Sequence, residues 1–350
     1  MGLVCTATLA PPAFSLRAPS TIHAPLYSAQ QPFLDTAQAD LLRASALAQD
    51  DRCDQALPLL RQAVDKSPDQ VMSVYPMALC LFEAAMNEGD ALKRRHVLLQ
   101  AEDAFLRAQT LNPQATLTYM KLGKIALLRG DARQAIRYYK LGLAVMPANA
   151  VLLFNLASVY DDVGDSAQAL ALYEKTLAVD SRFLYAYNNL GLLYDARGDS
   201  ARAQSLYRSA LRVNPSYNYA RLNLAKSLAR ANRLPQAERQ LTRAVAVEPD
   251  NPWAYLYLGD VYLRRNAPEK AARAYEASIR LNPRFAPPYY LLAIAYGKAR
   301  RYDEALQAAL GYLRLDPSGD HAREAIALMA ALRLVQIETA RRDAEPASLR

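Results

Sequence analysis

The feature that most constrains this chain is a period of 34 residues, which runs through most of its 350 residues. Proline marks the period at six positions: Pro113, Pro147, Pro215, Pro249, Pro283 and Pro317. The interval from Pro147 to Pro215 spans two periods, and Ser181 stands where the missing proline would fall. A Leu followed by a small residue recurs in step, and an Ala follows each Leu after thirteen residues, as in Leu190, Gly191 and Ala203. A period of this length is typical of chains that stack one structural unit many times.

Each unit has the spacing of two helices. Residues at i, i+3, i+4 and i+7 lie on one face of a helix, and the unit that begins at residue 184 places there Tyr187, Leu190, Gly191 and Tyr194. Ala203 and Tyr207, which are four residues apart, indicate a second helix. Gly198 and Asp199 separate the two helices, because Gly suits the left-handed position after one helix and Asp caps the start of the next. One such hairpin cannot bury both of its faces, so neighbouring units must stack.

These residues resemble the tetratricopeptide repeat family, in which an aromatic residue, Leu-Gly, Tyr, Ala, an aromatic residue, Ala and Pro recur with this period. One unit matches the pattern throughout, with Tyr187, Leu190, Gly191, Tyr194, Ala203, Tyr207, Ala210 and Pro215. The resemblance implies an all-α fold, a right-handed α-solenoid of stacked helix-turn-helix repeats. It also implies a non-enzymatic scaffold that binds other proteins.

The period divides the chain into segments. Six regular units are predicted for residues 116–319 and two degenerate units for residues 37–115. Pro68 and Pro113 are 45 residues apart, which is one period plus eleven residues. Eleven residues make three helical turns, so we expect this insertion to lengthen one or both helices near residues 85–97. In the unit 218–251, three residues stand where neighbouring units have Tyr, namely Arg221, Leu228 and Leu241. This departure predicts a bend in the stack, unless Leu fills the space of Tyr equally well.

Two terminal segments flank the repeats. Residues 320–340 are predicted to form a capping helix that shows a polar outer face and covers the last unit with Ala325, Leu328, Leu332 and Val335. Residues 341–350 are expected to form a polar tail. Residues 1–36 are expected to be a disordered or processed leader, because the first 34 residues contain no acidic side chain and many Pro, Ala, Ser and Thr.

The cysteines leave the location of the protein open. Cys5 is a lipidation candidate, since Gly2-Leu3-Val4 before it is a weak match to a lipoprotein cleavage site and the same start fits an N-acylation pattern. No basic segment precedes the short apolar run, so a signal peptide fits poorly. We expect a cytoplasmic protein or, if the N-terminus is a processed or truncated signal, one of the cell envelope, with membrane contact only through a lipid. Cys53 and Cys80 are either buried small side chains or a pair that requires an oxidising compartment.

Composition and motifs argue against several kinds of site. Three His and three Cys are too few for a rich metal site, and the chain has no phosphate-binding Gly-rich loop, H-E-x-x-H run or nucleophile elbow. We therefore predict no catalytic residue, no metal and no small-molecule cofactor. The 42 basic and 34 acidic residues mildly favour an acidic partner. Lys and Arg are spread over all the repeats without a basic-aromatic motif, which argues against nucleic acid.

The candidate binding surface is the side of each first helix that points away from the stack. If the Leu-Gly pair points into the stack, the second, sixth, ninth and thirteenth residues of each unit point outward. In the tetratricopeptide family this stripe lines the concave groove. The stripe contains Tyr185, Tyr219 and Trp253 at position two, Lys121, Asn155, Asn189 and Asn223 at position six, Lys124 and Lys226 at position nine, and Arg230, Arg264 and Lys298 at position thirteen.

Part of this stripe has a purely structural explanation. The helix dipole favours cations at position thirteen, and the aromatic residues can pack onto the next unit. Neither reason explains three Asn in register, because Asn is an indifferent helix former and its carboxamide can bind a peptide unit as both donor and acceptor. The series resembles the Asn ladder in the repeat region of O-linked N-acetylglucosamine transferase, which implies a grip on an extended peptide backbone.

The insertion carries a second candidate surface, the basic run Lys93, Arg94 and Arg95. It is interpreted either as a solvated helix end or as a prong that docks a partner. The sequence thus predicts a scaffold that binds an extended or acidic segment of another protein in its groove. Two alternatives remain. One is a membrane-anchored lipoprotein that acts as an assembly factor in secretion, pilus or envelope biogenesis, and the other is a basic solenoid associated with nucleic acid.

Overall fold

The computed structural model describes residues 36–50 and 52–344, and within these ranges it has seventeen α-helices and no strand. The helices are α1 (Thr36–Gln49), α2 (Cys53–Lys66), α3 (Val71–Asn87), α4 (Ala91–Leu111), α5 (Thr116–Leu128), α6 (Ala132–Val145), α7 (Ala150–Asp162), α8 (Ser166–Val179), α9 (Leu184–Ala196), α10 (Ser200–Val213), α11 (Asn218–Arg230), α12 (Leu234–Val247), α13 (Pro252–Arg264), α14 (Pro268–Leu281), α15 (Pro287–Lys298), α16 (Tyr302–Leu315) and α17 (Ala322–Ala344). The predicted leader, apart from its last residue, and Cys5 lie outside the described residues, as does the end of the predicted tail.

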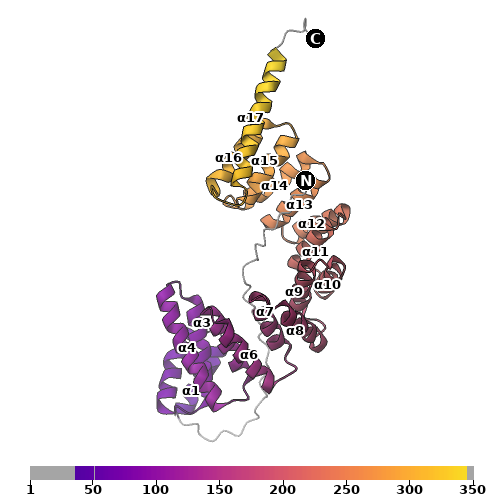
Figure 1. The fold of residues 1–350 in the computed structure, drawn as a ribbon. Coiled ribbons are helices and arrows are strands. Elements are labelled where there is room, and N and C mark those ends of the chain that lie inside the picture. Colours follow the sequence, from indigo (N-terminus) through magenta and orange to yellow (C-terminus); the bar gives the residue numbers. More distant parts are fainter. Residues whose placement is uncertain (1–35, 51, 345–350) are drawn as a thin grey trace.

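The helices form a right-handed α-solenoid, as the repeat predicted. Each helix packs against the next one along the chain, and α11 also contacts the first helices of both neighbouring units, α9 and α13. Figure 1 shows the stack as a curve in which α9 and α11 lie toward the inner side and α10 and α12 toward the outer side. The six regular units therefore present their first helices on one side and their second helices on the other.

The turns within the units have the chemistry that the sequence predicts. Asp131, Asp165 and Asp199 each accept a hydrogen bond from the backbone N–H three residues later, which caps the second helix. The preceding glycines have φ of 79° to 83°, a conformation that other residues rarely adopt. In the last three units this left-handed position holds Asn232, Asn266 and Arg300, and Asn is the residue that tolerates it best after Gly.

In three units the glycine after the repeating Leu receives a Tyr ring from the second helix of its unit, as Gly123, Gly191 and Gly259 show. A Cβ atom built on Gly123 would lie 2.3 Å from the Tyr139 ring. In the unit 218–251, Ala225 faces the shorter Leu241, and both are fully buried. Leu228 is also buried, with 2% of its surface exposed. Leu therefore fills the space that Tyr fills in other units, as the sequence analysis allowed as the alternative to a bend.

The eleven extra residues of the second degenerate unit lie in its two helices. Helix α3 has 17 residues and α4 has 21, whereas α5 and α6 of the next unit have 13 and 14. A disulfide joins Cys53 at the start of α2 to Cys80 in α3, with their Cα atoms 4.9 Å apart. The bond ties the two degenerate units together, and it resolves the question that the sequence left open for these cysteines.

Helix α17 covers the last unit. Ala325 and Leu332 are buried against α15 and α16, and Leu328 is half-buried beside them. Two expectations are corrected here. The outer face of α17 is not uniformly polar, because it exposes Ile326, Leu334 and Ile337. The helix also continues to Ala344, so the tail predicted from residue 341 begins as helix.

Candidate functional site

The candidate site is the first-helix face, by which we mean the side of α5, α7, α9, α11, α13 and α15 that carries the second, sixth, ninth and thirteenth residues of each unit. The structure describes all twelve side chains predicted there. Four of them are exposed, namely Lys124, Arg230, Arg264 and Lys298, and the other eight are half-buried. The stripe therefore lies at the edge of the packed stack, where a side chain can contact both the protein and a ligand.

Two of the three aromatic residues at position two, Tyr185 and Trp253, pack onto the residue that precedes the next first helix. The rings of Tyr185 and Tyr217 meet edge to face with centroids 5.6 Å apart, and the ring of Tyr219, on the helix that Tyr217 precedes, lies 5.9 Å from that of Tyr217. Trp253 lies 4.4 Å from Phe285. Tyr217 and Phe285 each stand just before the first helix of a unit, so these contacts join consecutive units. The structural explanation for the aromatic residues thus holds, although each ring keeps an exposed part.

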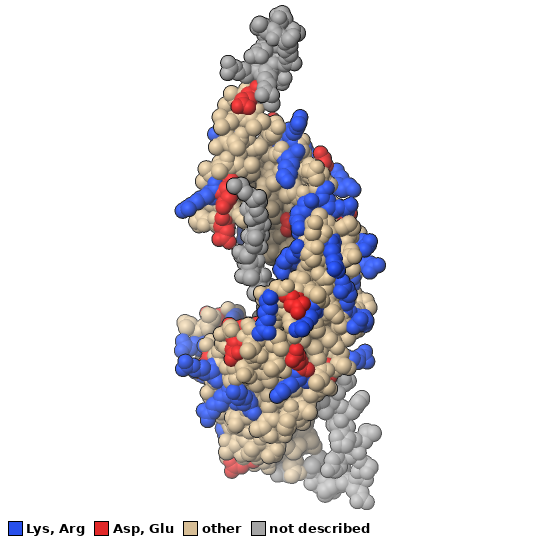
Figure 2. Space-filling model, turned by 45° about the vertical axis from the view of Figure 1, so that its right-hand side comes forward, with Lys and Arg blue, Asp and Glu red and all other residues tan. Residues whose placement is uncertain are grey.

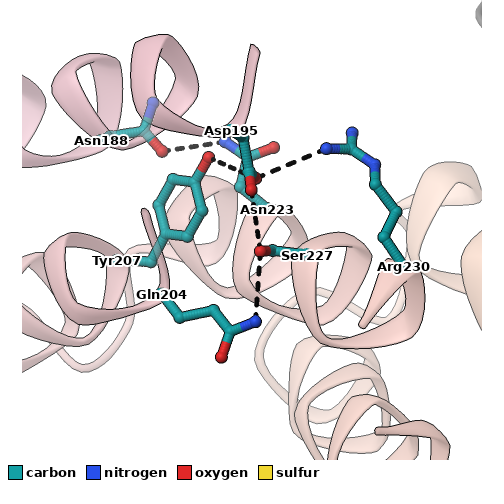
Figure 3. Close-up of polar contacts among 7 residues, drawn as sticks. All are labelled: Asn188, Asp195, Gln204, Tyr207, Asn223, Ser227 and Arg230. Carbon is teal, nitrogen blue, oxygen red and sulfur yellow. Dashed lines mark hydrogen bonds and ion pairs between the residues drawn. The ribbon is translucent and has the colours of Figure 1, made fainter. Parts of the chain in front are cut away.

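The position-six carboxamides are not equivalent. Asn223 Nδ2 donates a hydrogen bond of 2.9 Å to Asn188 Oδ1 in the preceding unit (Figure 3). Asn188 Nδ2 in turn donates to Asn189 Oδ1, and Asn189 Nδ2 donates to Tyr173 Oη at 3.1 Å. Asn155 makes no such bond among the described residues. Two members of the predicted ladder therefore also link units, Asn223 through Asn188 and Asn189 through Tyr173. Asn188 is buried and was not among the predicted residues.

A buried carboxylate lies at the centre of the same region. Asp195 on α9 has 6% of its side chain exposed. Its Oδ1 accepts a hydrogen bond of 2.9 Å from Ser227 Oγ, and its Oδ2 accepts one of 3.1 Å from Tyr207 Oη. Arg230 Nη1 lies 3.6 Å from the same Oδ2, and Figure 3 shows these groups converging on Asp195 from α9, α10 and α11. Arg230 is therefore held in place by this carboxylate.

Lys226 lies at the centre of the first-helix face, between two acidic groups. Its Nζ is 5.0 Å from the centroid of the Tyr257 ring. Burial lowers the pKa of its ammonium group, as does the nearby Arg230, while Asp195 and Asp260 oppose the shift. No carboxylate of the described residues comes within the 4.0 Å of an ion pair with Lys226. The ammonium thus lies over a ring, partly desolvated, without a direct ionic partner.

Asp260, which is half-buried, is the second acid of this region. Burial raises its pKa to about 6, although a hydrogen bond of 2.7 Å from Tyr275 Oη and the charges of Arg264 and Lys226 act in the opposite direction. The sequence analysis missed both Asp195 and Asp260. Asp260 is the ninth residue of its unit, the position that holds Lys124 and Lys226 elsewhere, so the register alone could have identified it. Asp195 is the twelfth residue of its unit, outside the predicted stripe, and no sequence signal marked it.

The remaining predicted cations have different surroundings. Lys121 lies 4.6 Å from the Phe82 centroid and 3.8 Å from Glu83, and burial lowers the pKa of its ammonium group. Arg264 Nη1 donates to the carbonyl of Ala229 at 2.6 Å. Lys124 and Lys298 point to solvent. The structure therefore groups the stripe around α9, α11 and α13, with Lys121 and Lys124 at one end and Lys298 at the other.

The basic run of the insertion lies in the first turn of α4. Lys93, Arg94 and Arg95 are all exposed, and Arg94 Nε donates to the carbonyl of Glu88 at 2.9 Å. The dipole disfavours cations at a helix N-terminus, so local helix energetics do not explain why they occur here. Both interpretations of this run, the solvated end and the docking prong, stay predictions.

Two negative observations apply to the described part of the chain. Residues 36–50 and 52–344 contain no group of three or more His, Cys, Asp or Glu side chains that could hold a metal ion. Over the same ranges, every helix is too short or too polar to cross a lipid bilayer.

Comparisons with known proteins agree with this architecture. Models described as tetratricopeptide repeat match residues 152–184, 188–238, 222–284 and 274–307. No curated protein sequence matches the chain significantly. Among solved structures, PilF of Pseudomonas aeruginosa is 22% identical with a TM-score of 0.54, covering 61% of this chain and 98% of its own.

Two further structures show the same architecture. PilW, whose structure is described as that of a widely conserved type IV pilus biogenesis factor, is 18% identical with a TM-score of 0.55, covering 61% of this chain and 99% of its own. A tetratricopeptide repeat protein of Parabacteroides merdae is 21% identical with a TM-score of 0.53, covering 71% of this chain and 97% of its own. Likenesses at this level of identity concern the fold.

Proposed function

Because this chain belongs to the tetratricopeptide repeat family, we propose that it is a scaffold whose first-helix face binds an extended, acidic segment of another protein. The observation that carries the proposal is the state of Lys226. A half-buried ammonium over the Tyr257 ring has lost part of its hydration, and it has no carboxylate within ion-pair distance among the described residues. A carboxylate of the partner supplies the missing counter-charge, with a hydrogen bond stronger than one between neutral groups.

The carboxamides beside Lys226 retain hydrogen-bonding capacity for a peptide backbone. An Asn side chain has two N–H donors and an oxygen with two lone pairs. Asn223 uses one donor toward Asn188, and Asn189 uses one donor and one acceptor site within the stack. Each thus keeps at least one donor and one acceptor site for a ligand, which is what an extended backbone requires.

The charges of this region favour an acidic peptide over nucleic acid. Arg230 and Arg264 border Lys226 and add positive charge, and Tyr185, Tyr219 and Trp253 offer partly exposed rings for side chains of the ligand. Asp195 and Asp260 lie among the same cations. These acids offset part of the positive charge, which leaves enough for single carboxylates but little for a phosphate backbone, whose binding depends on many Lys and Arg contacts.

The proposal is tested with peptides selected on the full-length protein from a random display library. Enriched peptides are expected to be acidic, and Lys226→Met should weaken their binding about tenfold or more, because a hydrogen bond to a charged group is worth about 1.5–3 kcal/mol. Met keeps the aliphatic stem over Tyr257. The matched control is Lys270→Met, because Lys270 lies 5.8 Å from the Tyr262 ring on the second helix α14. Equal affinity of both variants, measured by calorimetry, would refute the proposal.

We also propose that the protein works in an oxidising compartment, such as the cell envelope. The Cys53–Cys80 disulfide supports this location, because disulfides persist in secreted and envelope proteins and are rare in the cytosol. It is the observation that favours the envelope alternative of the sequence analysis over a cytoplasmic location.

The protein is isolated from the native host in acid, which stops thiol–disulfide exchange. Cys53 and Cys80 are then expected not to react with thiol reagents, because they are joined in a disulfide. Reduction should then lower the free energy of unfolding by about 3 kcal/mol, since closing a loop of this length restricts the unfolded chain. Cys53→Ser combined with Cys80→Ser is the matched control, and reduction should not affect its stability. Free thiols in the freshly isolated protein would place it in a reducing compartment.

A further inference from the structure

A second charged surface lies away from the first-helix face. Between residues 200 and 247 the sequence has nine Lys and Arg side chains and a single acidic one, Glu238, which is paired with Arg265. In Figure 2 the blue side chains gather on the right-hand flank of the upper half of the molecule, at the height where α10 to α14 lie in Figure 1. The spread of cations over the whole chain thus contains a local concentration.

Four of the nine cations line a recess of about 360 Å³ between α10 and α12. Its walls carry Arg208 and Arg212 from α10 and Gln240 and Arg243 from α12, and its floor carries Arg221 from α11, with Leu211, Pro215 and Leu224. No carboxylate lines the recess. None of the four arginines forms an ion pair among the described residues.

Arg221 takes over the structural task of a tyrosine. At the same position of other units, Tyr119 and Tyr289 donate from their hydroxyl to the carbonyl six residues earlier, at 3.0 and 3.1 Å. Arg221 Nη2 donates to the corresponding carbonyl, that of Pro215. Packing therefore requires only a tyrosine here, and the guanidinium adds a charge and further donors that the stack does not use.

One further donor of Arg221 is buried without a partner. Only 7% of its surface is exposed, and its Nε has no hydrogen-bond partner in the structure. Burial lowers the pKa of this guanidinium, and the charge of Arg243 lowers it further. An unsatisfied buried donor costs about 1–3 kcal/mol, and more when it is charged. An anion in the recess offsets the burial of this charge and relieves the repulsion among the four cations.

We propose that the recess between α10 and α12 binds the phosphoryl group of a small ligand. The guanidinium group is planar, and its forked donors match the oxygens of phosphate in bidentate pairs. A phosphoryl group brings close to two negative charges and three acceptor oxygens, which four arginines can share, whereas a single carboxylate brings one charge. Arg221 faces the recess while Asn223 and Lys226 of the same helix belong to the first-helix face, so the two sites are separate.

The test uses pyrophosphate as the probe, measured by calorimetry on the full-length protein. Binding to the wild type is expected, with inorganic phosphate weaker and acetate weaker still. Arg221→Tyr should reduce the affinity for pyrophosphate about tenfold or more and leave the melting temperature of the free protein unchanged or higher, because Tyr occupies this position in other units. Arg273→Gln on α14 is the control, since Arg273 is exposed outside the recess, and it should bind as the wild type does.

A second variant keeps the test decisive if Arg221→Tyr disturbs the unit. Arg208 and Arg243 are exposed, so Arg208→Gln combined with Arg243→Gln should weaken binding without affecting the fold. Three results would overturn the proposal: no binding of pyrophosphate by the wild type, equal affinity in both recess variants and the Arg273→Gln control, or binding only to anionic phosphatidylglycerol vesicles. The last result would identify a membrane-facing surface instead of a site for a small phosphorylated ligand.

Discussion

Truncation after Gly319, which removes α17, is expected to produce a protein that aggregates and melts well below the full-length chain. Helix α17 covers Tyr290, Leu292 and Tyr312, which are 2–7% exposed in the intact protein. Burying one large apolar side chain is worth about 1.5–3 kcal/mol, so uncovering three of them removes on the order of 5 kcal/mol. The truncation also exposes a contiguous apolar face, which promotes association between molecules. Light scattering and thermal unfolding measure the two consequences.

Two matched variants separate capping from a general effect of shortening. Truncation after Ile337 keeps every described buried side chain of α17 and is expected to leave solubility and melting nearly unchanged. Leu332→Asp keeps the length and places a charge at a residue that is 5% exposed, and it should reproduce much of the destabilisation. A truncation at Gly319 that remains soluble and melts with the full-length protein would show that α17 is not a cap.

Replacing Asn155, Asn189 and Asn223 together by Ala is expected to weaken binding of a selected acidic peptide about tenfold or more. Each net hydrogen bond contributes about 1 kcal/mol, and several are lost per ligand. The contacts within the stack add a second consequence. The bonds from Asn223 to Asn188 and from Asn189 to Tyr173 disappear as well, so unfolding should become easier by about 1–2 kcal/mol. The fold should survive nonetheless, because Ala is a better helix former than Asn.

Asn155 distinguishes the two roles of the carboxamides. It makes no side-chain hydrogen bond among the described residues, so Asn155→Ala should reduce the affinity a few-fold and leave the unfolding free energy unchanged or slightly higher. Asn188→Ala is the opposite control, because Asn188 is 6% exposed and serves the stack, and it should mainly lower stability. If the triple variant loses stability and keeps wild-type affinity, the Asn ladder serves only to join the units.

The repeat made the fold predictable because the same few contacts recur in every unit. A Leu, a small residue and a ring at fixed spacing dictate which helix faces meet, and the structure places them so, with Gly123 against Tyr139 as one instance. Asp131, Asp165 and Asp199 cap helices as their neighbouring glycines suggested. Local chemistry and period were therefore sufficient for the architecture of the regular units.

Contacts between units were less predictable, because they depend on the rise and rotation from one unit to the next. The bond between Asn223 and Asn188 spans 35 residues and joins a sixth to a fifth position. Ser227 reaches Asp195 across 32 residues in the same way. The Cys53–Cys80 disulfide likewise required the packing of α2 on α3. Residue spacing within one unit does not predict these contacts between units.

The use of Arg221 shows a different limit of sequence reasoning. Its departure from the repeat pattern was visible, and it was interpreted as a bend together with Leu228 and Leu241. The structure shows that all three are buried and that Arg221 preserves the hydrogen bond of the tyrosine it replaces. The four arginines around the recess are scattered between residues 208 and 243, and only the packing of α10, α11 and α12 brings them together.

The position of a bound peptide tests the central claim most directly. A photo-crosslinking amino acid replaces either Tyr219 on the first-helix face or Ser205, an exposed residue of the second helix α10. At saturating concentration of a selected acidic peptide, crosslinks are expected from position 219 and not from position 205, and unlabelled peptide should compete them away. Crosslinks from position 205 alone, with none from position 219, would place the ligand on the outer side of the solenoid and contradict binding by the first-helix face.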